Sequence, residues 1–124
     1  MSTDQKQAAA GTPPGAVLVF AVLKNRSDFL RAARAKKVVT PGFILQVRDR
    51  RDDDPMIRVG YTCSKKVGNA VARNRAKRRL REIARLVLPL HGSTGHDYVL
   101  IGRAAATATL PFDQMLKQLE DAVR

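Results

Sequence analysis

The segment from Asn69 to about Leu88 constrains the fold most, because it predicts a helix with one narrow apolar side. That side consists of residues at helical spacing, namely Ala72, Ala76, Leu80, Ile83 and Val87. Pro89 and Gly92 are expected to end the helix. Because a stripe of this kind can pack on a sheet, the rest of the chain should supply strands.

The strands of that sheet are predicted at Lys36–Thr40, Phe43–Asp49, Met56–Ser64 and His96–Arg103. The second and third segments are separated by the charged turn "RRDDDP", so we expect them to form an antiparallel pair. Residues alternate along the third segment, which gives it one apolar side made of Ile57, Val59, Tyr61 and Cys63.

Two shorter helices complete the prediction. Phe29 to Ala35 forms one, with Ser27 or Asp28 as its cap, and an amphipathic helix starts at Pro111. The order α-β-β-β-α-β-α predicts an α+β fold, a small two-layer α/β sandwich with a four-stranded sheet. We expect residues 25–124 to form a single domain and residues 1–24 to be a flexible N-terminal extension.

Positive charge is concentrated on the long predicted helix and the loop before it. Between Ser64 and Arg85, nine Lys or Arg residues less one acid, Glu82, give +8 of the net charge of +12. One acid cannot pair with all of them, so this surface predicts a polyanionic partner, nucleic acid first and an anionic membrane surface second. Six of the nine are Arg, whose planar group fits phosphate, and this favours structured nucleic acid.

Nothing in the sequence indicates catalysis by the protein itself. Cys63 is the only cysteine and is typical of a core position, and His91 and His96 lack the neighbours that a metal site needs. Asp52–Asp54 indicates a solvated turn. The apolar run Gly15–Leu23 is far shorter than the roughly 20 residues of a membrane span, so we expect a cytoplasmic protein with no membrane partner.

The stretch from Arg58 to Arg85 closely resembles the bacterial ribonuclease P protein component. A strand with "RVG", the loop "SKKVGNAV" and the motif "RNR" opening a basic helix occur in the order and spacing typical of that family. Weaker similarity extends over residues 25–124. The resemblance implies a ribosomal-protein-like topology with a left-handed crossover around "VGNAV", whereas such connections are usually right-handed.

The resemblance also implies a function. Members of the family assist a catalytic RNA, which removes the 5′ leader from precursor tRNA with Mg²⁺ held by the RNA, and the protein needs neither a catalytic residue nor a metal of its own. The implied partners are the ribonuclease P RNA and precursor tRNA, and no protein partner is required. The positions implied to contact the RNA subunit are Lys65, Lys66, Asn69, Arg73, Asn74, Arg75, Lys77, Arg78 and Arg81.

A second implied surface is a cleft between the first helix and the sheet, which holds the single-stranded leader. Phe29 matches an aromatic residue of that cleft and Phe43 opens the strand beside it, and such rings would stack on a base. Phe29 is equally compatible with a core position. Arg31 and Arg48 are the other expected leader contacts, and Ala33 and Gln46 replace aromatic residues that are common in the family.

Two other functions remain as alternatives. A structural RNA-binding protein of the ribosome could share this fold, although the block "SKKVGNAVARNR" argues against it. A DNA-binding module is the other alternative, but the basic helix lacks the partner helix of a helix-turn-helix.

Overall fold

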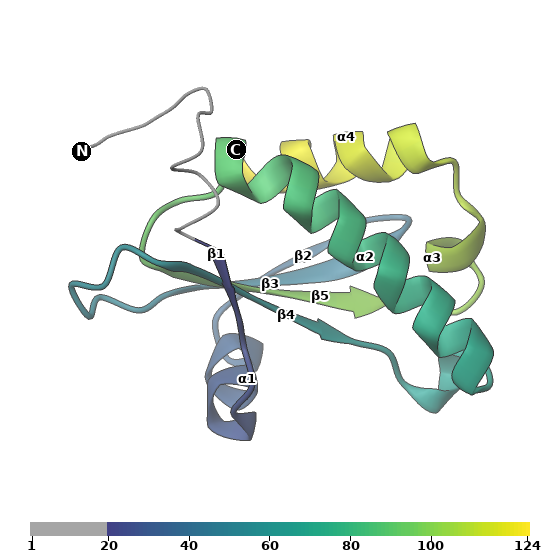
Figure 1. The fold of residues 1–124 in the computed structure, drawn as a ribbon, viewed down its shortest axis with the longest axis horizontal. Coiled ribbons are helices and arrows are strands. Elements are labelled where there is room, and N and C mark those ends of the chain that lie inside the picture. The colour runs from purple at the N-terminus through teal and green to yellow at the C-terminus, as the bar shows by residue number, and fades with distance from the viewer. Residues whose placement is uncertain (1–19) are drawn as a thin grey trace.

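The computed structural model describes residues 20–124, and all structural statements below concern this part of the chain (Figure 1). The elements in chain order are β1 (Phe20–Val22), α1 (Arg26–Ala33), β2 (Lys36–Val39), β3 (Phe43–Asp49), β4 (Ile57–Thr62), the 3-10 turn η2 (Lys65–Val67), α2 (Ala70–His91), β5 (His96–Gly102), α3 (Ala106–Thr109) and α4 (Phe112–Val123). The α+β class and the order of the main elements are confirmed, but the sheet has five strands and not the predicted four.

The sheet has the strand order β1-β4-β5-β3-β2. Strand β3 runs antiparallel to both its neighbours, whereas β4 is parallel to β1 and β5. The prediction that β3 and β4 pair with each other is therefore wrong, because β5 lies between them. The loop after β3 spans this gap, and Arg50 Nη2 holds it by donating to the carbonyls of Asp54 at 2.9 Å and Met56 at 2.7 Å.

Strand β1 corrects a second prediction. Residues up to 24 were expected to form a flexible extension, but Phe20–Val22 is an edge strand, and Leu23 N–H donates to the carbonyl of Val59 at 2.8 Å. Leu23 is itself buried. The folded domain therefore includes Phe20–Leu23, and residues 1–19 lie outside the described part of the chain.

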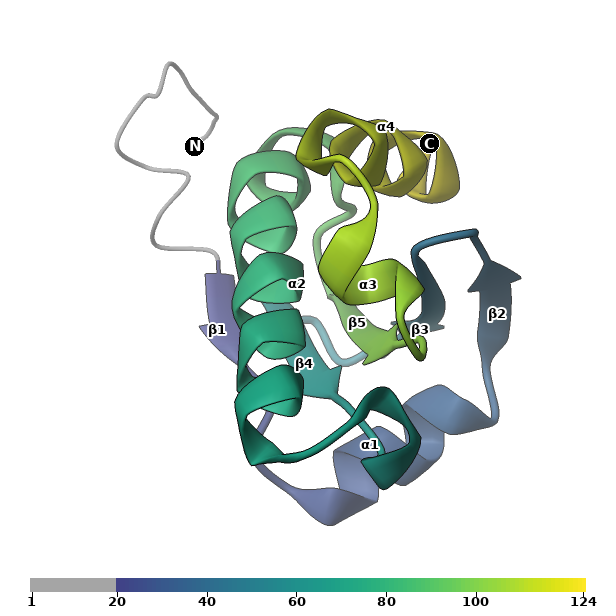
Figure 2. The ribbon, with the colours of Figure 1, turned by 90° about the vertical axis from the view of Figure 1, so that its right-hand side faces the viewer.

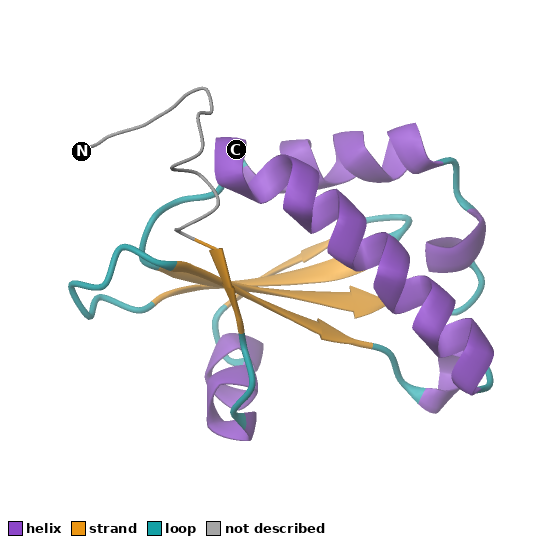
Figure 3. Ribbon diagram, in the orientation of Figure 1, coloured by secondary structure: helices purple, strands orange, loops and turns teal. Residues whose placement is uncertain are grey.

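Helices cover both faces of the sheet. Figures 2 and 3 show α2, α3 and α4 over one face and α1 over the other. The main core lies under α2 and α4, with Leu45, Leu80, Leu100 and Leu119 fully buried, and a smaller cluster of Leu23, Ala32 and Val99 lies under α1. The side chains on the two faces of the sheet can therefore serve different roles.

The connection from β4 to β5 through α2 is left-handed, as the resemblance implied. In Figure 2 the carboxyl ends of these parallel strands face the reader, and the chain passes from β4 over the sheet through α2 into β5 on the right of β4. This is the opposite of the usual hand. Because α2 follows β4 in the chain, it begins at the carboxyl edge of the sheet, directly after the loop that contains Lys65 and Lys66.

Two helix boundaries differ from the predictions. Helix α2 passes through Pro89 and ends at His91, because Pro89 removes one hydrogen bond only in the last turns of a long helix. Helix α1 begins at Arg26 rather than Phe29, with Asn25 as its first flanking residue and no side-chain cap. Asp28 lies inside the first turn of α1, where its negative charge suits the helix dipole.

Candidate nucleic-acid interface

The loop before α2 is built to present two lysines to solvent. Ser64 Oγ accepts the backbone N–H of Lys66 at 3.3 Å, and Asn69 Oδ1 caps α2 by accepting the N–H of Ala72 at 2.9 Å. Gly68 has a φ of 142°, and a Cβ there would lie 2.8 Å from the side chain of Ala72, so only glycine fits this tight turn. Lys65 and Lys66 are both exposed on the resulting 3-10 turn.

Three arginines of α2 already have partners within the described part of the chain. Arg73 donates to the carbonyl of Gly68 at 2.8 Å, which ties the helix to the loop before it. Arg79 donates to the carbonyl of Thr107 at 2.9 Å and fastens α3 to α2. Arg85 pairs with Glu82. Arg73 and Arg79 are only partly exposed, as expected for side chains that flank the apolar stripe.

The remaining basic side of α2 faces outward. Asn74, Arg75, Arg78 and Arg81 are exposed and Lys77 is half-buried. Within residues 20–124, Arg85 is the only one of the nine basic residues between Ser64 and Arg85 that forms an ion pair. This basic surface, defined here as Lys65, Lys66, Asn74, Arg75, Lys77, Arg78 and Arg81, therefore lacks internal neutralisation in the described chain.

Within residues 20–124, Arg81 is the one exposed arginine of this surface that contacts an aromatic ring. Its guanidinium carbon lies 5.5 Å from the centre of the Tyr61 ring, which is a cation–π contact. Burial raises the pKa of Tyr61 to about 12, although the charge of Arg81 acts in the opposite direction. The phenol oxygen is buried and has no hydrogen-bond partner within the described residues.

A second cluster of arginines, which the sequence analysis missed in part, lies on the sheet face that α1 covers. Arg48 of β3 and Arg58 of β4 are both register partners of Asp97 of β5. Arg58 binds the Asp97 carboxylate through Nε and Nη2, each at 2.8 Å, and Arg50 adds a bond of 2.8 Å. Asp97 is fully buried. The alternation of β4 could have placed Arg58 on this face, but the register with Asp97 requires the tertiary structure.

Asp97 is charged in this setting, and its environment explains why. Burial alone would raise the pKa of Asp97, but hydrogen bonds from Arg58 and Arg50 outweigh burial and hold the pKa below its ordinary value of 3.8. The hydrogen bonds that Arg58 donates to Asp97 raise the pKa of Arg58. The carboxylate therefore joins β3, β4 and β5 through charged hydrogen bonds.

Helix α1 joins this cluster through Asp28. Its carboxylate lies 3.3 Å from Arg31 Nη1 and 3.4 Å from Arg58 Nη2. Arg31 is exposed, as a leader contact requires, and Arg48 is partly exposed on the sheet. The structure thus brings Arg31 and Arg48, two of the predicted leader contacts, to the same side of the molecule.

The two predicted aromatic contacts lie on opposite faces of the sheet. Phe43 is completely buried in the main core beneath α2 and α4, so the prediction that its ring stacks on a leader base is wrong. The reason is strand alternation, which turns Phe43 away from α1. Phe29 lies on the α1 side and is half-buried, and a Cβ at Gly60 would lie 2.4 Å from its ring. Gln46 is half-buried on β3, and Ala33 is exposed on α1.

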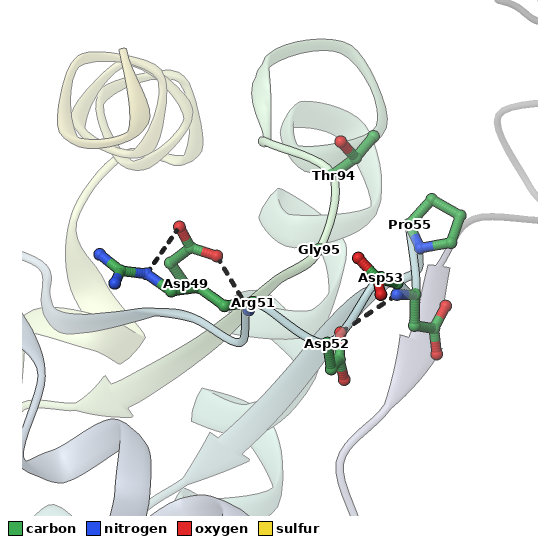
Figure 4. Close-up of a pocket in the computed structure, with 8 residues that line it drawn as sticks. Asp49, Arg51, Asp52, Asp53, Pro55, Thr94 and Gly95 are labelled. Carbon is green, nitrogen blue, oxygen red and sulfur yellow. Dashed lines mark hydrogen bonds and ion pairs between the residues drawn. The ribbon is translucent and has the colours of Figure 1, made fainter.

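The acids of the loop after β3 form a separate, negatively charged hollow. Figure 4 shows Asp49, Asp52 and Asp53 around it, and Asp49 bonds the neighbouring Arg51. These acids are exposed, which confirms the solvated turn that the sequence indicated. Among residues 20–124 no group of three or more His, Cys, Asp or Glu side chains is suited to a metal ion.

Cys63 is half-buried and packs against the main core. Burial raises the pKa of its thiol, although a hydrogen bond from the backbone of Gly102 acts in the opposite direction. This environment fits the predicted packing role better than that of a nucleophile. No helix in the described part of the chain has the length and hydropathy needed to cross a membrane.

Comparison with known proteins agrees with this geometry. The family model for ribonuclease P matches residues 20–124. The ribonuclease P protein component of Ruegeria pomeroyi is 59% identical over 106 residues, which cover 85% of each chain. That of Caulobacter vibrioides is 51% identical and covers 86% of this chain and 70% of the relative.

Solved structures show the same fold. The RNase P protein from Thermotoga maritima matches with a TM-score of 0.67 and 28% identity, over 82% of this chain and 93% of that one. The protein from Staphylococcus aureus matches with a TM-score of 0.65 and 30% identity, over 81% and 89% of the two chains. The chain therefore belongs to the ribonuclease P family, as a protein component of the bacterial type that works with an RNA subunit in tRNA processing.

Proposed function

We propose that this chain binds the RNA subunit of ribonuclease P through the basic surface and binds the 5′ leader of precursor tRNA on the sheet face beside α1. The loop around Asn69 and the first turn of α2 at Arg73 belong to the same RNA-subunit contact. The RNA carries out the phosphodiester hydrolysis with Mg²⁺ that it holds itself. The reaction takes place in the cytoplasm, where precursor tRNA is made.

The observation that carries the first half of this proposal is the pairing pattern of α2. Arg75 and Arg78 are exposed and form no ion pair with a described residue, although like charges on one helix repel each other. RNA phosphates would remove this repulsion and release counterions. Arginine also matches the geometry of phosphate oxygens better than lysine does.

The second half is supported by the α1 side of the sheet. Arg31 and Arg48 are accessible there, and Phe29 on the same side of the sheet is only half-buried. Charged groups next to an aromatic edge suit a single strand, since the groups bind the backbone and the ring contacts a base without selecting its sequence.

Reconstitution tests the proposal directly. Purified protein is added to a bacterial ribonuclease P RNA and cleavage of precursor tRNA is followed at low and high Mg²⁺. We expect the protein to restore cleavage at low Mg²⁺, because its cations replace some of the metal ions that screen RNA phosphates. Protein without RNA should cleave nothing.

The matched control replaces two cations elsewhere. Arg75→Ala with Arg78→Ala should lose most of the stimulation. Lys117→Ala with Arg124→Ala removes the same charge from exposed positions on α4 and directly after it, and should keep the stimulation. Equal loss in both double variants would mean that only net charge matters. No stimulation by the unmodified protein would refute the proposed function.

A further inference from the structure

We infer that Arg58 and Arg48 together bind a phosphate group of the single-stranded leader, and that the buried carboxylate of Asp97 is the residue that positions them. This inference rests on the proposed function and adds two sheet residues, Arg58 and Asp97, to the leader surface. Its starting point is a row across three strands, Arg48 on β3, Asp97 on β5 and Arg58 on β4, which are direct register partners.

The two arginines keep hydrogen-bond donors available. Arg58 uses Nε and Nη2 on Asp97 and Asp28, and its Nη1 has no hydrogen-bond partner among the described residues. Arg48 uses only Nη1, in a long bond of 3.4 Å to Asp97. A guanidinium group carries five N–H donors, so both side chains can bind a further acceptor without leaving the carboxylate.

The charges of the cluster leave a positive excess. Four cations, the side chains of Arg31, Arg48, Arg50 and Arg58, contact three carboxylates, those of Asp28, Asp52 and Asp97, which leaves one net positive charge. Arg50 is only 2% exposed and is bonded on several sides, so it is structural. The excess is therefore carried by Arg58 and Arg48, which are 27% and 24% exposed.

Asp97 fixes the direction of these groups. Its two carboxylate oxygens accept bonds from three guanidinium groups, and it is itself completely buried. A flexible arginine loses conformational entropy when it binds a phosphate, and an arginine that is already held loses less. Because Asp97 makes no contact with solvent, we assign it positioning and not direct binding.

The neighbouring aromatic residue favours a nucleic-acid strand over an isolated anion. The Phe29 ring packs on Gly60, which follows Arg58 by two residues and points to the same face of β4. Two residues along a strand span about 6.6 Å, which is on the scale of one nucleotide step in a single strand. A leader phosphate can therefore bind at Arg58 while the adjacent base contacts the exposed part of Phe29.

The test compares two substrates in the reconstituted holoenzyme, precursor tRNA with its leader and the same tRNA without it. We expect Arg58→Gln to weaken affinity for the leader-bearing substrate by about tenfold, since one charged contact is lost, and to leave the leaderless tRNA unaffected. The dependence of log affinity on log salt should flatten by about one unit for the leader-bearing substrate only.

Arg51→Gln is the matched control, because Arg51 is 86% exposed on the loop after β3 and loses the same charge. It should leave both affinities unchanged. A loss in Arg58→Gln that is equal for both substrates would overturn the inference, since the site would then contact the tRNA body. Unchanged affinity for both substrates would overturn it as well.

Asp97→Asn tests positioning. It keeps the shape of the side chain and should also weaken leader-dependent binding, while affinity for leaderless tRNA stays unchanged. Val59→Ala, which destabilises the same sheet from its other face, should not change leader dependence. If Asp97→Asn fails to fold, Arg58→Lys is measured in its place. This variant keeps the positive charge but loses the planar geometry of the guanidinium group, so leader affinity should fall by a smaller factor than in Arg58→Gln. Leader affinity equal to wild type in the folded variant would refute the positioning role.

The outcome also separates this inference from the proposed function. If Arg75→Ala with Arg78→Ala weakens binding to the RNA subunit but Arg58→Gln has no leader effect, only the inference fails. If the double variant binds the RNA subunit as tightly as wild type at all salt concentrations, the proposed function itself fails.

Discussion

The arginines of α2 and the arginines of the sheet occupy opposite electrostatic surroundings. Arg75 and Arg78 are exposed and have no acidic partner in the described chain, whereas Arg50 and Arg58 meet the buried carboxylate of Asp97. A carboxylate loses its hydration when it is buried, so it is stable there only with such partners. Asp97 therefore fixes Arg50 and Arg58 in place against the sheet, whereas Arg75 and Arg78 have no described acid that competes with a polyanion.

The largest expected effect comes from removing Asp97. Asp97→Ala leaves Arg48, Arg50 and Arg58 without their shared carboxylate, and Arg50 is buried while the other two are partly buried, so the free energy of unfolding should fall by about 3 kcal/mol or more. Urea denaturation measures this. Asp121→Ala removes an exposed acid that lies 3.8 Å from Lys117 and should change stability by no more than about 0.5 kcal/mol. Similar values for the two variants would remove the contrast between buried and exposed acids.

The second effect concerns binding and not stability. Arg75→Ala with Arg78→Ala should weaken affinity for the RNA subunit by about tenfold or more at 0.1 M salt and flatten the salt dependence by about one unit per lost contact. The denaturation midpoint should stay close to that of wild type, because both side chains are exposed. A filter-binding or fluorescence titration across salt concentrations gives the slope, and an unchanged slope would exclude this side of α2 from the interface.

The third effect is the acid sensitivity of the sheet cluster. The pKa of Asp97 is lowered in the folded protein, so its stabilising contribution is complete above its unfolded value near 3.8 and is lost as the pH falls through the lower folded value. Wild type should therefore lose its stability advantage over Asp97→Asn only below about pH 4. Denaturation curves from pH 7 to pH 2 test this, and a difference that vanishes between pH 7 and pH 5 would contradict the assigned charge.

The smallest effect concerns the contact between Arg81 and the Tyr61 ring. Tyr61→Phe keeps the ring and removes a buried hydroxyl that has no described partner, so stability should change little. Tyr61→Leu removes the ring and should cost RNA affinity about 0.5–1 kcal/mol through the cation–π contact. Equal RNA affinities for the two variants would show that the ring does not orient Arg81.

Several elements were predictable because their signals are local. The apolar stripe from Ala72 to Val87 determines α2, and the alternation from Ile57 to Cys63 determines which side of β4 is buried. The surplus of arginine over acid on α2 was equally visible, since no acid other than Glu82 lies within reach along the helix.

Other elements were not predictable because they depend on long-range pairing. The position of β5 between β3 and β4 overturned the expected hairpin, and it also placed Asp97 between Arg48 and Arg58. Phe43 resembled a leader contact by position, but the packing of β3 against α2 and α4 turned it into the core. The strand at Phe20–Val22 was missed because a short edge strand has few residues to reveal its pattern.

By itself, the sequence determined the helix, its basic side and the class of partner, because helical periodicity and unbalanced charge are properties of nearby residues. The tertiary structure alone decided which arginines are used internally. Whether a guanidinium group is held or free depends on which strand lies beside it, and strand order is set by the burial of the whole sheet between α1 and the helices of the other face.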